Sequence, residues 1–189
     1  KRLLAPGIVA LIADVIGFRA RRAATEKKGK LRGLGLGPYL EGTGGSPEEF
    51  AEVRVFPDGR VDVPVGSQSQ GQSHETVFAQ VVAQQLGVPF EAVRIVAGDT
   101  DKVAKGVGTF ASRSMVRAGA AAVEVCDLVI ALGAQMAAHL METSVSDIEY
   151  RGGAFQVAGT DRRIGLFEVA RAAESGQVPP SLGSLLMAA

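Results

Sequence analysis

Residues 67–76 read Ser-Gln-Ser-Gln-Gly-Gln-Ser-His-Glu-Thr and lie where a strand pattern stops and a helix pattern starts. Before this stretch, residues 54–56 and 61–65 form two short strand patterns, joined by a Pro-Asp-Gly sequence that is typical of a tight turn. After it, apolar residues recur at helical spacing over residues 77–86, and Gly87 is a typical helix end. The sequence therefore predicts a strand, a polar glycine-containing loop and a helix N-terminus in succession.

Such a junction can bind an anion. The first N–H groups of a helix have no intrahelical partners, and the aligned peptide dipoles add positive potential there. Hydroxyl groups at Ser67, Ser69, Ser73 and Thr76 can add donors to the same place. The loop has neither the Gly-Lys-Ser/Thr ending of a P-loop nor the three-glycine dinucleotide fingerprint. A serine-rich loop at this position is also typical of ordinary helix capping, so both interpretations stand at this point.

A second junction of the same kind follows. Residues 93–97 form a compact β-branched strand pattern, and a loop with two nearby glycines then leads to a helical pattern over residues 113–143. The glycines, Gly106 and Gly108, permit close backbone approach. Ser112 is a favourable N-cap residue for the helix, and the Arg113 guanidinium suits phosphate or carbonyl oxygens. Polar groups suited to an anionic ligand are therefore expected at both junctions.

Composition excludes several classes of protein. The chain has 189 residues and a mass of 19.6 kDa, with 20 basic and 20 acidic side chains, so no net field favours nucleic acid. Its single cysteine, Cys126, excludes an internal disulfide framework and any multi-cysteine metal or iron–sulfur site, and it suits a reducing compartment. No run of eighteen apolar residues predicts a membrane span, and the N-terminal apolar run is too short for a secretory signal. We therefore expect a cytoplasmic protein.

The remaining patterns predict an α+β fold in which hairpin strands and long helices form two layers. Residues 8–28 have a helical stripe, residues 31–45 suit a glycine-containing strand, residues 147–157 suit a hairpin, and residues 165–173 suit a short closing helix. We expect an N-terminal helix and connecting strand over residues 1–46 and an α+β subdomain over 47–189. Both ends lack clear caps, which favours a fragment of a longer chain.

Two separated motifs resemble one known family. Residues 69–76 are similar to the Gln-Gly-Gln-Gly-His-Glu-Thr loop of the large, molybdenum-binding subunit of the xanthine dehydrogenase, aldehyde oxidase and carbon monoxide dehydrogenase family. Residues 98–101 and 108–114 resemble the second cofactor loop of that family, and the motifs occur in the right order. The similarity extends along most of the chain, including residues 42–44 and 178–180.

The resemblance implies that both loops hold the pterin and dinucleotide portion of a molybdopterin cofactor, expected in its cytosine dinucleotide form. Gln72, Ser73 and His74 would surround the pterin and the metal oxo end, while residues 112–114 would lie near the phosphates or the cytosine. The expected cofactor-binding residues are Gly71, Gln72, Ser73, His74, Thr76, Gly108, Thr109, Ser112, Arg113 and Ser114. No catalytic residue and no protein metal ligand are expected in this chain.

Two departures from the family pattern bear on function. Ser73 stands where the family has glycine, so a positive φ or a close cofactor approach there would strain or crowd the serine. The family's catalytic glutamate belongs to a Gly-rich motif farther along the large subunit, and its earlier Gly-Gly-Phe-Gly loop is also absent here. The chain is then a middle piece of the subunit, inactive alone, whose partners are the remaining large subunit and iron–sulfur and FAD portions. Self-association into a homo-oligomer is a further possibility.

Two functions from different classes follow. The first is a cofactor-binding segment of a molybdenum hydroxylase, in which hydroxylation uses a water-derived oxygen and electrons leave through partner subunits. The second is a non-catalytic packing or assembly domain derived from that family. Among individual residues, His74 suits a capping role, Glu75 suits stabilisation of the helix dipole, and Asp99 and Asp101 suit turn formation rather than a cation site.

Overall fold

The computed structural model describes residues 17–35 and 42–188 and divides the chain into two units, residues 1–41 and 42–189. In the first unit, helix α2 (Phe18–Glu26) confirms part of the predicted helix over 8–28, whose residues 8–16 lie outside the described ones. The strand predicted over 31–45 is wrong for residues 31–35 and 42–45, which have no strand pairing; residues 36–41 lie outside the described part. Alternating glycines weaken strand formation there, because they offer no side chains to pack.

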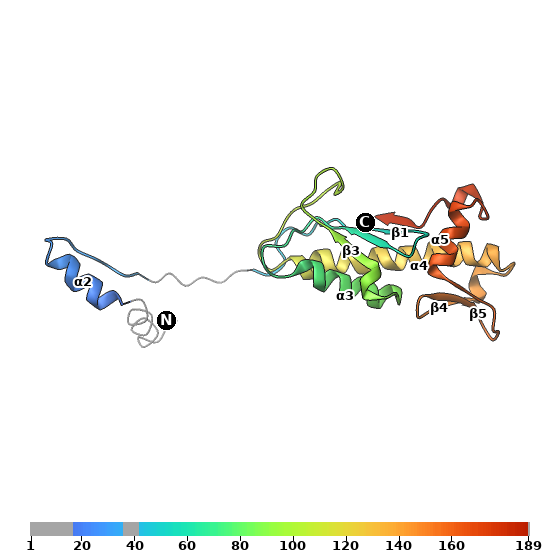
Figure 1. Cartoon of the computed structure of the whole chain (residues 1–189), viewed down its shortest axis with the longest axis horizontal. Helices are drawn as coiled ribbons and strands as arrows, with labels where there is room; N and C mark the ends of the chain where they lie inside the picture. Colours follow the sequence, from blue (N-terminus) through green and yellow to red (C-terminus); the bar gives the residue numbers. More distant parts are fainter. Residues whose placement is uncertain (1–16, 36–41, 189) are drawn as a thin grey trace. The chain divides into compact units, whose positions relative to one another are not determined.

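The second unit contains a four-stranded sheet with the order β3-β2-β1-β7 (Figure 1). The strands are β1 (Glu52–Val55), β2 (Val61–Pro64), β3 (Val93–Val96) and β7 (Leu186–Ala188). The predicted hairpin is confirmed, since β1 and β2 pair antiparallel. Strand β3 pairs parallel to β2, and β7 pairs antiparallel to β1. The sequence did not predict β7.

Helix α3 (His74–Leu86) connects the parallel strands β2 and β3, and it ends at Gly87, whose φ of 60° fits the predicted left-handed stop. The second predicted helix begins with a π-helical turn, Met115–Gly119, and continues as α4 (Ala120–Leu140). Helices α3 and α4 pack against each other, α3 also packs on β3, and α4 packs on β1 and β7. This is the predicted arrangement of a helical layer on a sheet.

A smaller sheet lies near the C-terminal half of α4 (Figure 1). Strands β4 (Ile148–Arg151) and β5 (Ala154–Val157) form the predicted hairpin, and β6 (Arg163–Gly165), which was not predicted, pairs with β5. The expected closing helix is α5 (Leu166–Glu174). A close contact joins α4 to this sheet, because a Cβ atom built on Gly133 would lie 2.4 Å from Cζ of Phe155.

The core of the second unit is shared by both sheets and all three of its helices. Its fully buried members come from the larger sheet, from all three helices and from β5, and include Val53, Val63, Phe78, Val82, Leu86, Val125, Cys126, Val129, Met136, Phe155 and Val169. The α+β class with strand–loop–helix junctions is therefore confirmed. Close packing in the core fixes the sheet and α3, so the loops that follow β2 and β3 begin from a rigid base.

Candidate cofactor site

The two loops singled out in the sequence lie side by side. Because β2 and β3 are parallel neighbours, the loops that follow them leave the same edge of the sheet. A hydrogen bond joins the loops directly, since the Thr109 hydroxyl donates to the Gln68 carbonyl oxygen at 2.5 Å, and the Ser67 hydroxyl oxygen also lies 3.4 Å from the Gly108 carbonyl oxygen. The motifs that are separated by about forty positions in sequence thus form one structural site.

The loops also meet backbone to backbone. A Cβ atom built on Gly66 would lie 2.5 Å from Cα of Gly106, and one built on Gly106 would lie 2.8 Å from Cα of Gly66. Side chains do not tolerate separations that short, so glycine is needed on both sides of the contact. The close approach predicted for Gly106 is confirmed, and its partner is Gly66.

A pocket of about 250 Å³ lies at this junction. Its lining comes from the end of β2, the turn after β3 and the second loop, and consists of Val65, Gly66, Gln68, Gly98, Asp99, Thr100, Val103, Gly106, Val107 and Gly108. Of the residues expected to bind cofactor, Gly108 is the one that lines it. The Asp99 carboxylate accepts from the Asp101 backbone N–H at 3.1 Å and pairs with Lys102 at 2.8 Å, so it forms a turn, as predicted. These contacts, with Lys102 first, lower the pKa of Asp99.

Backbone strain is concentrated in the two loops. The described residues include four non-glycine positions with positive φ, and three of them are Ser73 at 59°, Ala111 at 48° and Ser112 at 51°. Left-handed dihedrals are unfavourable for residues with a Cβ atom, and they cluster at ligand sites, where the surrounding structure enforces them. Position 73, where the family motif has glycine, therefore has the positive φ that would strain a serine.

Neither strained serine caps a helix in the ordinary way. Ser73 precedes α3 but makes no side-chain capping hydrogen bond; instead, the Ser69 hydroxyl accepts weakly from the His74 backbone N–H at 3.4 Å. The expectation that Ser112 is the N-cap of the long helix is wrong. Helical geometry begins after it, and the left-handed φ of Ser112 belongs to the turn that leads to Arg113.

His74, at the first position of α3, carries an unpaired polar atom. The residue is 8% exposed, its ring lies 5.2 Å from that of Phe78, and its Nδ1 atom has no hydrogen-bond partner in the structure. Buried nitrogen atoms without partners are costly and uncommon in folded proteins. His74 therefore offers one unused hydrogen-bonding position at the helix N-terminus, where the dipole also favours negative charge.

Arg113 lies in the interior rather than at the surface of the second loop. Its side chain is fully buried and paired with Glu49, and it donates to the carbonyl oxygens of Gly108 at 2.9 Å, Ser46 at 3.3 Å and Glu48. The guanidinium expected beside a phosphate is thus engaged by the protein itself, while its Nε atom has no partner. Glu49 was not singled out in the sequence, because no local pattern distinguishes it from a surface glutamate.

The other predicted residues differ in accessibility. Gly71, Gln72, Ser73, Thr76 and Ser112 are exposed. Gly71 has a φ of 105° and open space where a side chain would stand, and the Gln72 side chain accepts from the Gln70 backbone N–H at 2.5 Å. Ser114 is buried, and its hydroxyl donates to that of Thr109 at 3.4 Å. The exposed residues of the first loop therefore present hydrogen-bond donors to solvent. The second loop is held mainly by contacts within the protein.

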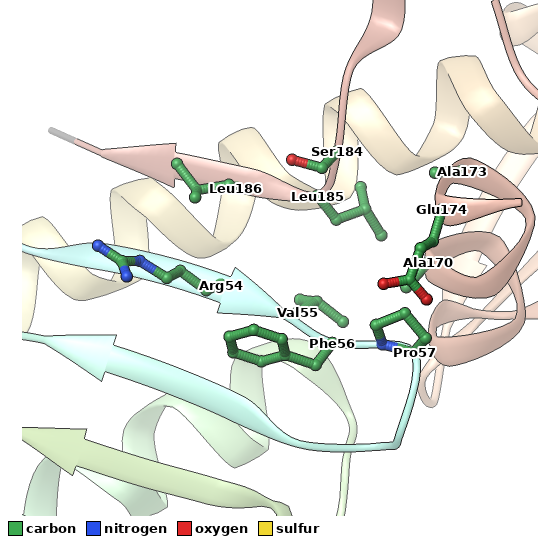
Figure 2. A pocket seen from close by; sticks show the side chains of 10 residues that line it. All are labelled: Arg54, Val55, Phe56, Pro57, Ala170, Ala173, Glu174, Ser184, Leu185 and Leu186. Carbon is green, nitrogen blue, oxygen red and sulfur yellow. The ribbon is translucent and has the colours of Figure 1, made fainter. Parts of the chain in front are cut away.

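Figure 2 shows another pocket, of about 230 Å³, between the end of β1, helix α5 and the segment that enters β7. Side chains of Val55, Phe56, Pro57, Ala170 and Leu185 give it an apolar lining; the Glu174 carboxylate lies beside Ala170 and Pro57, and the Arg54 guanidinium points away from them (Figure 2). None of the loop residues described above takes part in it. The junction of the two loops is therefore the better candidate for a polar cofactor.

Two negative findings apply to the described residues. Within residues 17–35 and 42–188, no three side chains among His, Cys, Asp and Glu gather closely enough to hold a metal ion. In the same ranges, no helix combines the length and the apolar character needed to cross a bilayer.

Comparison with known proteins settles the family. Residues 11–182 match the model of the molybdopterin cofactor-binding domain. The chain belongs to this family. With its relatives among carbon monoxide dehydrogenases and xanthine dehydrogenases, it is part of the molybdenum hydroxylase group, as the two loop motifs suggested.

Three similar proteins illustrate the relationship. The gamma subunit of the 6-hydroxypseudooxynicotine dehydrogenase complex of Paenarthrobacter nicotinovorans is 40% identical over 76% of this chain and 18% of its own length. The carbon monoxide dehydrogenase large chain of Afipia carboxidovorans is 32% identical over 89% of this chain and 23% of its own length. A crystal structure of a Cu,Mo-CO dehydrogenase has 31% identity and a TM-score of 0.73, with 98% of this chain and 26% of that chain covered. The chain thus spans about a quarter or less of these relatives.

Proposed function

We propose that this chain is a segment of a molybdenum hydroxylase large subunit and holds a molybdopterin dinucleotide cofactor between its two loops. The observation that supports this most strongly is the unpaired Nδ1 of buried His74, located at the N-terminus of α3 within the loop that carries the family motif. The left-handed residues in both loops also support this proposal, since backbone strain of this kind accompanies ligand sites.

The residues divide into two groups. Gly71, Gln72, Ser73, His74 and Thr76 provide donors from the first loop to the pterin end of the cofactor. The second loop contacts the dinucleotide end through Gly108, Thr109, Ser112 and Ser114. Arg113 stabilises that loop from the protein interior. The cytosine dinucleotide form is the one we propose, on the basis of the motif resemblance. When bound, the cofactor supplies the redox chemistry for hydroxylation of a substrate with a water-derived oxygen.

The complete subunit would act with partners. The relatives are described as large chains or as subunits of complexes, which supports a partnership with iron–sulfur and FAD subunits that carry electrons away. A cytoplasmic location fits the single cysteine, which is buried and free. The catalytic base is expected in the remainder of the large subunit.

A non-catalytic packing or assembly domain is the second candidate, and two observations favour it. Ser73 places a side chain where the family motif has glycine, and the Arg113 guanidinium is already engaged by Glu49. The serine side chain would crowd a cofactor at that position, and the engaged guanidinium leaves one cation fewer to contact the cofactor. An assembly domain would retain the fold but would not gain stability from the ligand.

A thermal-shift titration with cytidine 5′-diphosphate separates the two candidates, both in this chain and in the complete large subunit. A ligand at 100 times its dissociation constant stabilises the folded state by about 2.7 kcal/mol. We expect Ser112→Ala, which removes an exposed hydroxyl group from the second loop at the dinucleotide end, to reduce the shift. Ser181→Ala removes an exposed hydroxyl group from another turn, Pro180–Leu182, and serves as the control. No shift in either protein would contradict the cofactor-binding proposal.

A further inference from the structure

Glu49 lies where the two loops meet the segment that precedes β1. Its side chain is 1% exposed, and both of its carboxylate oxygens are in use. Oε1 accepts from the backbone N–H groups of Phe50 at 3.0 Å and Val107 at 3.4 Å. Oε2 accepts from the Ser67 hydroxyl at 3.0 Å and from Arg113. One carboxylate therefore contacts the beginning of the first loop and both ends of the second.

Arg113 completes the same connection from the other side. Its guanidinium joins Glu49 to the Gly108 carbonyl oxygen and to the carbonyl oxygens of Ser46 and Glu48. Both charged groups are removed from water, so each depends on the other for electrostatic compensation. Loss of either charge would leave its partner buried and unbalanced.

The strained turn of the second loop depends on this pair. Ala111 and Ser112, with φ of 48° and 51°, directly precede Arg113. Consecutive left-handed residues persist only where neighbouring contacts fix the chain on both sides. The Arg113 side chain fixes one side, and a hydrogen bond from the Gly44 backbone N–H to the Ala111 carbonyl oxygen, at 3.0 Å, fixes the other.

We infer that Glu49 and Arg113 are positioning residues for the cofactor site, which hold both loops in a single prearranged geometry before any ligand arrives. The inference rests on the proposed function for the identity of the ligand, and on the contacts above for the coupling of the loops. Prearrangement of this kind strengthens binding, because the free protein has less conformational freedom to lose.

Native-state hydrogen exchange tests the coupling without any cofactor. In the full chain, we expect Glu49→Gln to accelerate amide exchange in both loops, 66–73 and 106–114, by at least about tenfold, while core amides of α4 keep their wild-type rates. Arg113→Lys, which keeps the charge but loses the forked geometry, should give a smaller effect at the same amides. If Glu49→Gln does not fold, Glu49→Asp retains the charge and tests the same geometry.

Glu52→Gln is the matched control. Glu52 is also buried, at 7% exposure, and pairs with Arg54, but it lies within β1, where it is paired with Ala188 of β7. We expect it to leave exchange in the loops unchanged. Acceleration in only one loop, or equal acceleration throughout the fold, would overturn the inference, since the first shows uncoupled loops and the second shows general destabilisation.

Titration with cytidine 5′-diphosphate adds a second readout. If the wild-type chain binds this probe, Glu49→Gln should raise its dissociation constant by about tenfold or more, and Glu52→Gln should not. Equal affinity of wild type and Glu49→Gln would contradict the positioning role. If neither the wild-type chain nor the complete large subunit binds the probe while the loops still exchange together, the coupling is supported and the proposed function fails, so the two failures are distinguishable.

Discussion

Replacement of Ser73 by glycine should stabilise the protein. Ser73 has φ of 59° and ψ of 44°, a left-handed conformation that costs an L-residue about 1–2 kcal/mol. Glycine adopts this conformation freely, although its greater freedom in the unfolded chain offsets about 0.4–1 kcal/mol of the gain. No side-chain capping hydrogen bond is lost. The net expectation for Ser73→Gly is a stabilisation of about 0.5–1 kcal/mol.

Ser69→Gly is the matched control in the same loop. Ser69 is not among the positive-φ residues, and its hydroxyl accepts from the His74 backbone N–H at 3.4 Å. Glycine at this position brings the entropic penalty and loses the hydrogen bond, so we expect a destabilisation of about 0.5–1 kcal/mol. The two substitutions are chemically identical and should change the free energy of unfolding in opposite directions.

Equilibrium unfolding in urea measures both changes, with the midpoint shifting at constant slope. In a thermal scan, Ser73→Gly should raise the melting temperature by about 1–4 °C, given the size of the folded unit. A loss of stability in Ser73→Gly, or an equal effect of both substitutions, would show that the left-handed conformation of Ser73 is not strained. The argument from backbone strain to a ligand site would then lose its basis.

Four further predictions concern the core, the thiol and the contact between the loops. Gly133→Ala places a Cβ atom 2.4 Å from Cζ of Phe155 and should destabilise the protein, because overpacking costs about 1–3 kcal/mol and helix propensity returns only about 1 kcal/mol. In a Phe155→Leu background the same substitution should be neutral or stabilising. Urea titrations measure both changes. Burial, followed by the charge of the neighbouring aspartate, raises the pKa of the Cys126 thiol to about 12, so iodoacetamide at pH 8 should label it in the unfolded chain but not in the folded one. Since the unfolded thiol ionises near pH 8.5 and the folded one only near pH 12, this residue's contribution to stability should fall as pH rises through that window, as measured by urea midpoints. Gly66→Ala should destabilise the protein by about 2 kcal/mol or more, because the new Cβ atom would clash with Glu49 and with the backbone of Gly106. Gly42→Ala is the control, since a Cβ atom there has open space around it. Equal urea midpoints for the two variants would refute the close contact.

Elements with strong local signals were predictable from the sequence. Helix α3 has regular apolar spacing and ends at Gly87, and the β4–β5 hairpin turns at two glycines, so both follow from local chemistry. Strand β7 could not be predicted in this way. It has three residues, and it becomes a strand only through pairing with β1, more than a hundred positions earlier in the chain.

The candidate site shows the same division between local and distant information. The sequence indicates two polar loops after strands, and the parallel pairing of β2 and β3 brings them together. The sequence also suggests a ligand-facing Arg113, but its surroundings depend on Glu49, 64 positions away. No local pattern indicates that this arginine is buried, since burial of a charge depends on a partner that only the folded chain provides.

The pairing of β7 with β1 also has a consequence for the order of folding. Strands β1 and β2 are joined by a short turn, whereas β7 must close a loop from residue 52 to residue 188. Chain entropy makes that closure less favourable than the hairpin by about 3 kcal/mol. We therefore expect β7 to join the sheet late and to leave it early. The outer edge of β1 would be exposed in partly folded molecules, and chaperones or self-association would act on that edge first.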